Sequence, residues 1–163
     1  MEFKMKKLIF ILFLNLDLFV FAQNCKYLVT VNADNLKETG KFKLMLKNID
    51  GKFFKIPKEI NFCNMRLVDL EFYNEITQSF KKMELSNKDI DCFTYKDKDI
   101  KLKPNKIYVY NVNIKSDFEV IQSSKFFEIF NDRKYRFKIS FYLDSYIQCG
   151  ESNRLVTDWI YKN

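Results

Sequence analysis

The sequence contains no histidine, and it has only 3 glycines and 2 prolines among 163 residues. The absence of histidine excludes a Ser-His-Asp or Cys-His catalytic centre, a histidine-ligated zinc or haem, and an imidazole that changes charge near neutral pH. Scarce glycine and proline, together with 17% aromatic residues, exclude a low-complexity fibre and a disordered chain. The length favours one folded domain.

The first 22 residues have the layout of a secretory signal peptide. Three lysines precede an apolar run over residues 8–21, and Ala22 provides a small residue at the predicted cleavage point. The run is shorter than the roughly 20 residues that span a membrane, and it contains Asn15 and Asp17. We therefore expect an exported protein, periplasmic or secreted, with one domain over 23–163 and no transmembrane segment after cleavage.

Four cysteines follow this signal: Cys25, Cys63, Cys92 and Cys149. An even number in an exported chain predicts two disulfides, and four cysteines allow three pairings. The absence of a Cys-x-x-Cys spacing disfavours a redox or zinc site, so we expect no metal or other cofactor. A lipoprotein signal ending at Cys25 is also disfavoured, because Asn24 stands where such a signal has a small residue.

Alternation of apolar and polar residues predicts an all-β protein of about seven or eight antiparallel strands. The alternating segments are those near Tyr27–Val31, Lys41–Lys47, Phe53–Ile56, Arg66–Phe72, Phe80–Leu85, Lys106–Ile114, Tyr135–Leu143 and Thr157–Tyr161. In the fourth segment, alternation places Val68 and Leu70 opposite Leu67 and Asp69. Asp50-Gly51 predicts a hairpin turn. Residues 86–99 are expected to form a loop, and residues 124–130 at most a short helical turn.

Two short motifs carry a resemblance. Leu102-Lys103-Pro104-Asn105-Lys106 is similar to the Leu-x-Pro-Gly-x turn that opens a late strand in bacterial immunoglobulin-like domains, with Asn105 at the glycine position. Asp132-x-x-Tyr135 resembles a tyrosine corner. The chain thus resembles small secreted bacterial immunoglobulin-like domains, which implies an antiparallel β-sandwich. It differs from antibody domains because its one tryptophan, Trp159, lies in the last strand.

The implied sandwich layout favours one cysteine pairing. Cys63 and Cys92 flank the open end of the hairpin expected at 66–85. Cys25 precedes the first strand and Cys149 follows the penultimate one, which places both at the same end of a sandwich. The layout therefore implies the pairs Cys63–Cys92 and Cys25–Cys149.

Few side chains are candidates for chemistry. Lys134, Arg136 and Lys138 form a basic stripe on one strand face, which is either an anion-binding patch or a solvated surface. Lysine outnumbers arginine 24 to 4, which makes a nucleic-acid partner an unfavoured interpretation. Asp69 and Glu71 share a strand face and leave a carboxylate-based hydrolase open.

Two further sets of side chains suggest weaker alternatives. Calcium could bind the pairs Asp89/Asp91 and Asp97/Asp99, and sugar rings could stack on Tyr142, Tyr146, Trp159 and Tyr161. No nucleophile motif is present. We therefore expect a non-enzymatic surface-recognition or envelope accessory module, inhibitor-like proteins included, with a protein or glycan partner. The alternative is a hydrolase or carbohydrate-binding module acting on extracellular glycan.

Overall fold

Strands dominate the computed structural model, which describes residues 24–86, 89–92, 98–122, 126, 128, 131–143 and 148–163. The strands are β1 (Tyr27–Asn32), β2 (Lys41–Asn48), β3 (Phe54–Pro57), β4 (Met65–Asn74), β5 (Ser79–Lys82), β6 (Asp99–Leu102), β7 (Ile107–Asn113), β8 (Tyr135–Tyr142), β9 (Arg154–Val156) and β10 (Ile160–Lys162). The helices are α2 (Leu36–Thr39), α3 (Ile114–Phe118) and the 3-10 turn η2 (Gly150–Asn153). The predicted signal peptide lies outside the described residues, as does most of the helical turn expected at 124–130.

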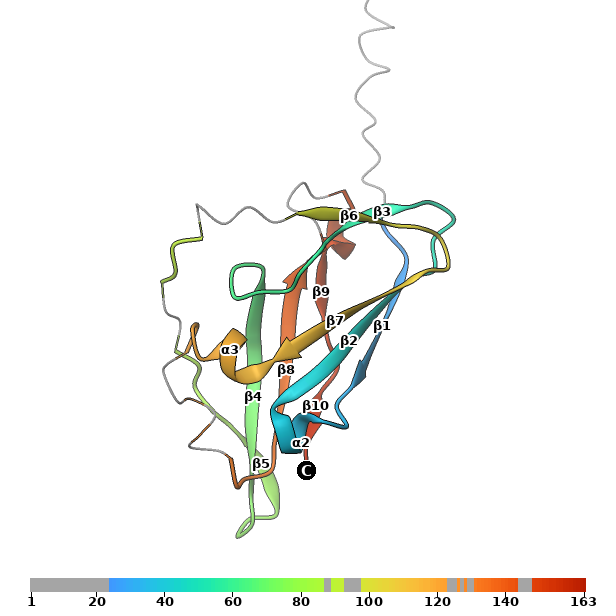
Figure 1. The fold of residues 1–163 in the computed structure, drawn as a ribbon. Helices are drawn as coiled ribbons and strands as arrows, with labels where there is room; N and C mark the ends of the chain where they lie inside the picture. Colours follow the sequence, from blue (N-terminus) through green and yellow to red (C-terminus); the bar gives the residue numbers. More distant parts are fainter. Residues whose placement is uncertain are drawn as a thin grey trace, which may run out of the picture.

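The described strands pair in antiparallel fashion throughout. One sheet has the order β1-β2-β7, and a larger sheet has the order β10-β8-β4-β5, with β9 also pairing with β8. Strands β3 and β6 form a separate pair. Figure 1 shows β2 and β7 running obliquely in front of β8. The prediction of a mainly β, antiparallel protein is confirmed.

The two larger sheets contact one another through aromatic side chains. Phe42 of β2 meets Phe137 of β8 with ring centroids 5.7 Å apart, and Tyr110 of β7 meets Phe141 of β8 at 5.6 Å. The inward residues of β8 are at most 2% exposed along its apolar face. Each fully buried large apolar side chain contributes about 1.5–3 kcal/mol. The alternation predicted for β8 therefore supplies much of the core.

Strand β4 departs from simple alternation at Val68. Its register with β8 shifts between Leu67 and Asp69, which is the signature of a β-bulge. The extra residue turns Leu67 inward, so that it is 7% exposed and shares the buried face of Leu70. The prediction that Leu67 lies opposite Leu70 is wrong, because strict alternation cannot accommodate an inserted residue.

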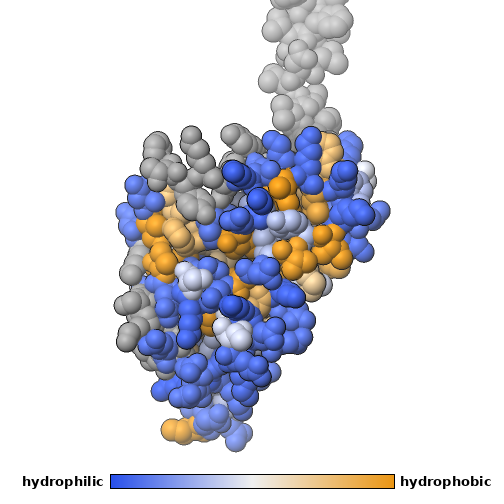
Figure 2. Space-filling view, viewed as in Figure 1, coloured by the Kyte–Doolittle hydropathy of each residue, from blue (hydrophilic) through white to orange (hydrophobic). Residues whose placement is uncertain are grey.

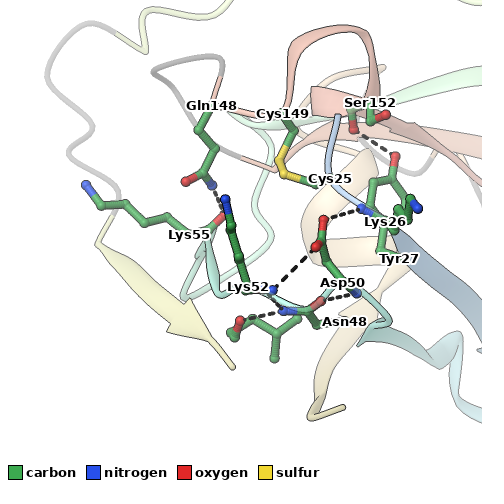
Figure 3. The surroundings of a disulfide bond; sticks show 11 residues. Cys25, Lys26, Tyr27, Asn48, Asp50, Lys52, Lys55, Gln148, Cys149 and Ser152 are labelled. Carbon is green, nitrogen blue, oxygen red and sulfur yellow. Dashed lines mark hydrogen bonds between the residues drawn. A yellow bond between two sulfur atoms is a disulfide. The ribbon is translucent and has the colours of Figure 1, made fainter. Parts of the chain in front are cut away.

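The Asp50-Gly51 turn connects two sheets and does not form the predicted hairpin. Strand β3 pairs with β6, while β2 pairs with β1 and β7. The reason is the fully buried side chain of Asn48 at the end of β2. Its Nδ2 donates to the main-chain oxygens of Lys52 at 2.9 Å and Leu102 at 2.8 Å, and its Oδ1 accepts from the Asp50 N–H at 2.7 Å (Figure 3). This amide directs the chain out of β2 towards β3 and binds it to the end of β6.

We expect Asn48→Ala to lower the free energy of unfolding by about 3 kcal/mol, because it leaves two main-chain carbonyls and one N–H without partners, at the lower end of about 1–3 kcal/mol each since two of the three bonds are only partly buried. Urea unfolding measures the loss. Asn111→Ala, which removes an exposed asparagine from neighbouring β7, is the matched control and should change stability by less than about 0.5 kcal/mol. Equal losses in the two variants would contradict the role of Asn48.

Positive φ angles occur at two positions that matter for the chain path. Asn105 has φ 61°, the left-handed conformation that the similarity to a Leu-x-Pro-Gly-x turn implies at the glycine position. The Lys106 N–H donates to the Lys103 oxygen at 3.2 Å and closes this turn. Gly40 has φ 68° at the end of α2, where an added Cβ would lie 3.2 Å from Cγ1 of Ile114. Both the positive φ and the close approach of Ile114 therefore favour glycine at position 40.

Strand β7 ends one residue earlier than alternation predicts over Lys106–Ile114, because α3 begins at Ile114. The Asn113 side chain accepts from the Lys115 N–H at 3.0 Å and caps the helix, and the Asp117 carboxylate accepts from the Asn113 N–H at 2.9 Å. Ile114 is nevertheless buried, at 3% exposed, so it lies on the inward face as predicted.

Other strand boundaries differ from expectation, among them that of β5, which ends at Lys82 instead of Leu85. Strands β6 and β9 were not expected, and the last strand begins at Ile160 instead of Thr157. The Thr157 N–H donates to the Ile139 oxygen at 3.0 Å, and its hydroxyl accepts from the Ile139 N–H at 3.2 Å. These segments are too short for a clear alternation and depend on the neighbouring strand for their conformation.

Two disulfides join Cys25 with Cys149 and Cys63 with Cys92. They are the pairs that the sandwich layout implies. Their Cα–Cα distances are 4.8 Å and 5.6 Å. A sulfur in a disulfide cannot also carry a lipid thioether, so the bonded Cys25 is incompatible with the lipoprotein alternative.

The surroundings of the first disulfide join three parts of the chain (Figure 3). The Tyr27 hydroxyl donates to the Ser152 oxygen at 2.8 Å, which connects β1 to η2. The Gln148 amide donates to the Lys55 oxygen at 2.5 Å, which connects the segment before η2 to β3. This disulfide therefore belongs to a network that holds β1, β3 and η2 together.

Candidate recognition surface

The outer face of the five-stranded sheet gathers most of the polar and aromatic side chains that the sequence singles out. The strand register places Glu71 of β4 beside Arg136 of β8, and Arg136 beside Tyr161 of β10. On the other side, Lys82 of β5 is opposite Glu71. Because directly opposed residues share a sheet face, four strands contribute one side chain each to a single row.

Arg136 and Glu71 form an ion pair at the centre of that row. The Nη2 and Nε atoms of Arg136 lie 2.6 Å and 2.7 Å from Oε2 of Glu71. The two side chains are 24% and 19% exposed. The hydrogen bond to Glu71 raises the pKa of Arg136, and a hydrogen bond to Tyr161 raises it further. The guanidinium is therefore committed to an acceptor within the protein.

Aromatic rings surround this guanidinium. Its central carbon lies 4.3 Å from the ring centroid of Phe80, 4.4 Å from that of Trp159 and 5.9 Å from that of Tyr161. All three distances are within the range of about 6 Å for cation–π attraction. We refer to Glu71, Phe80, Arg136, Trp159 and Tyr161 as the Arg136 cluster.

Lys134 and Lys138 border the Arg136 cluster. Lys138 Nζ lies 4.8 Å from the Trp159 ring centroid, and Lys134 Nζ lies 5.6 Å from the ring centroid of Tyr73. The structure thus brings the basic stripe of the sequence onto one face. Within that stripe, Arg136 is held by a carboxylate, so an external anion would meet the charges of the two lysines.

The acidic pair of the predicted hydrolase lies on the same face. Asp69 pairs with Lys82 at 3.3 Å, as Glu71 pairs with Arg136. A glycosidase needs one carboxyl that donates a proton to its substrate. Here each carboxylate is paired with a cation of a neighbouring strand, as in structural ion pairs.

The rings on this face do not form a flat platform. Ring planes meet at 68° for Tyr73 and Phe80 and at 75° for Phe80 and Tyr161. A sugar-stacking surface requires coplanar rings. Of the other tyrosines that the sequence suggests, Tyr142 is 53% exposed at the end of β8, and Tyr146 lies outside the described residues.

Tyr73 and Phe80 also belong to this surface, although neither was predicted as a site residue. Tyr73 continues the face of Asp69 and Glu71 along β4, so the alternation contained the signal that identifies it. The contact of Phe80 with Arg136 depends on the pairing of β5 with β4 and of β4 with β8. No local pattern could have shown it.

The remaining candidates do not assemble into a site in the described part of the chain. Asp89, Asp91 and Asp99 are exposed, and Asp97 lies outside it. Across the described ranges, no three His, Cys, Asp or Glu side chains gather as metal donors. Among those residues, no helix has the length and apolar character to cross a membrane.

The outer face of the three-stranded sheet has a different character. Leu28, Ile107 and Val109 are 52%, 57% and 42% exposed, and the register groups them with Met45 and Lys47. Figure 2 shows hydrophobic side chains interspersed with hydrophilic ones over this sheet. Small apolar areas of this kind are ordinary on protein surfaces.

The Arg136 cluster thus combines tilted aromatic rings, an internal ion pair and bordering cations on one sheet face. Comparison with protein-family models, with curated proteins and with solved structures found no match to this chain.

Proposed function

We propose that this protein is an exported, non-enzymatic recognition module with an immunoglobulin-like β-sandwich, and that it binds an acidic protein partner through the Arg136 cluster. The observation that carries the proposal is the placement of Phe80, Trp159 and Tyr161 around one guanidinium on an open sheet face. Trp, Tyr and Arg dominate the binding energy of protein interfaces. Because these side chains already contact one another, binding would cost little additional side-chain entropy.

Charge favours an acidic partner. The chain has a formal net charge of +7. On the proposed surface, Asp69 and Glu71 are each matched by a cation of the same face, and Lys134 and Lys138 stand at the border. Charges at the rim of an interface accelerate association and make it sensitive to salt.

Two observations weigh against the glycan alternatives, a carbohydrate-binding module and a carboxylate-based hydrolase. The rings are tilted by 68° and 75°, and both carboxylates are ion-paired. The two disulfides fit an oxidising compartment, which supports export.

Capture of partners from the culture fluid and periplasm of producing cells tests the proposal. We expect Trp159→Ala and Tyr161→Ala each to weaken retention of the same partner by about 30-fold, the equivalent of about 2 kcal/mol at an interface hot spot. Val109→Ala on the opposite sheet is the matched control and should retain the partner. Equal retention by all three variants, or a wild-type protein that retains nothing, would contradict the proposal.

A further inference from the structure

A second cationic feature lies at one end of the five-stranded sheet. A hollow of about 440 Å³ is lined by Lys37 of α2, by the 131–134 segment that leads into β8, and by Lys162 and Asn163. Figure 1 shows α2 beside the end of β10, near the C-terminal mark. Three segments far apart in the sequence therefore close one space, which we call the Lys162 hollow.

Lys162 is unusual for a lysine because it is only 7% exposed. Its Nζ donates to the main-chain oxygen of Asn131 and to that of Arg133, the latter at 3.4 Å, and it lies 5.3 Å from the Tyr135 ring centroid. These partners are neutral, and over the described ranges no carboxylate is in ion-pair contact with the ammonium. A buried charge ordinarily has a partner of opposite sign. An ammonium also has three N–H donors, of which the two carbonyls use two.

The charges around the hollow are mostly positive. Lys37, Arg133 and Lys134 line it together with Lys162, and the negative groups are the Asp132 side chain and the terminal carboxylate of Asn163. Burial lowers the pKa of Lys162, Asp132 opposes this shift and Lys37 adds to it. An anion in the hollow would therefore offset both the desolvation of the Lys162 ammonium and its repulsion by Lys37.

We infer that the Lys162 hollow binds the phosphate or sulfate group of a small ligand. A tetrahedral oxyanion with two charges offers acceptor oxygens to ammonium and guanidinium groups at once, whereas a carboxylate has one charge and only two acceptor oxygens. The volume of the hollow is within the range of about 300–1,000 Å³ typical of ligand pockets. The inference does not rest on the protein partner proposed above, because no member of the Arg136 cluster lines the hollow; Lys134 alone borders both.

Titration of the full chain with inorganic phosphate, followed by NMR chemical shifts at constant ionic strength, tests this site. We expect saturable binding tighter than about 1 mM, with shifts concentrated at the lining residues. Lys37→Ala and Arg133→Ala should each weaken binding about tenfold, since each removes a charged donor. Both side chains are exposed, so these variants retain the fold even if the buried-site variant Lys162→Met does not.

Lys43→Ala, on the outer face of the three-stranded sheet, is the matched control and should bind phosphate as the wild type does. Equal weakening by Lys43→Ala and Arg133→Ala would show a response to net charge and overturn the site. Sulfate and a sugar phosphate monoester are the other probes. Tighter binding of the monoester would assign the hollow to an esterified ligand, and tighter binding of the inorganic ions to a free oxyanion. Failure of all three probes to saturate would also overturn the inference.

Discussion

Replacement of Cys25 and Cys149 by serine is expected to lower the free energy of unfolding by about 5 kcal/mol. The disulfide joins residues 124 apart in the sequence. In the chain-entropy model, a loop of about 100 residues gives roughly 4.7 kcal/mol, and a longer loop gives slightly more. Because domains of this kind are stable by about 5–15 kcal/mol, the variant should be unfolded or close to unfolding at about 37 °C.

The other disulfide provides the internal comparison. Cys63 and Cys92 are separated by 29 residues, so their replacement by serine should cost less, about 3.5 kcal/mol. Urea unfolding of both double-serine variants, under conditions that keep the remaining bond oxidised, measures the two losses. The expected order has a structural reason as well, because the first bond belongs to the network that joins β1, β3 and η2. A larger loss for the Cys63–Cys92 variant would refute this account.

Stability is expected to fall above about pH 10, and the two most buried tyrosines, Tyr110 and Tyr135, together contribute about 2.7 kcal/mol per pH unit to the slope. Tyr110 and Tyr135 are 3% and 2% exposed, and burial raises the pKa of both above the ordinary 10.0. Interactions with Tyr108 and Asp99 raise the pKa of Tyr110 further, and its hydroxyl donates to the Pro57 oxygen at 2.8 Å. Because the folded pKa exceeds the unfolded one, the stabilisation is complete below pH 10. It is lost as pH rises towards the folded pKa.

Lys162 acts with the opposite sign. Burial lowers its pKa below the ordinary 10.5, so the unfolded chain binds the extra proton in the interval between the two values. Stability should therefore rise with pH in that interval before the tyrosines reverse the trend. Without histidine, no imidazole contributes to the profile between about pH 5 and 8.

Urea unfolding at a series of alkaline pH values measures the slope. Tyr110→Phe should reduce the slope by about 1.4 kcal/mol per pH unit, since it removes one proton that couples to folding. Tyr142→Phe removes a phenol that is 53% exposed and serves as the control. An unchanged slope in Tyr110→Phe would rule out the assignment. Return of the native fluorescence at pH 8 distinguishes reversible titration from chemical damage.

Local pattern was a sound guide wherever one face of a strand is buried without interruption. In β8 the inward positions are the predicted ones, and the basic stripe of Lys134, Arg136 and Lys138 lies on the opposite face. In β4 the same reasoning failed at Leu67, because a bulge adds a residue that no hydrophobicity pattern records. Asn48 shows the limit most clearly. It occupies an inward position where alternation expects an apolar residue, and this exception is the one sign of its role at the corner.

The candidate site was predictable only as separate pieces. Alternation identifies Arg136 and Glu71 as outward residues of different segments, but it cannot pair them. Their contact, and the positions of Phe80 and Trp159 around the guanidinium, require the order β10-β8-β4-β5.

The sequence by itself determined the absence of histidine chemistry, the even set of cysteines and the strand-forming alternation. These properties follow from composition or from the conformation of neighbouring residues. Only the tertiary structure decided that Arg136 is engaged by Glu71, and that Lys162 is buried beside three other cations. The physical reason is that burial and charge pairing depend on strand order and register, which bring together residues as distant as Lys37 and Lys162.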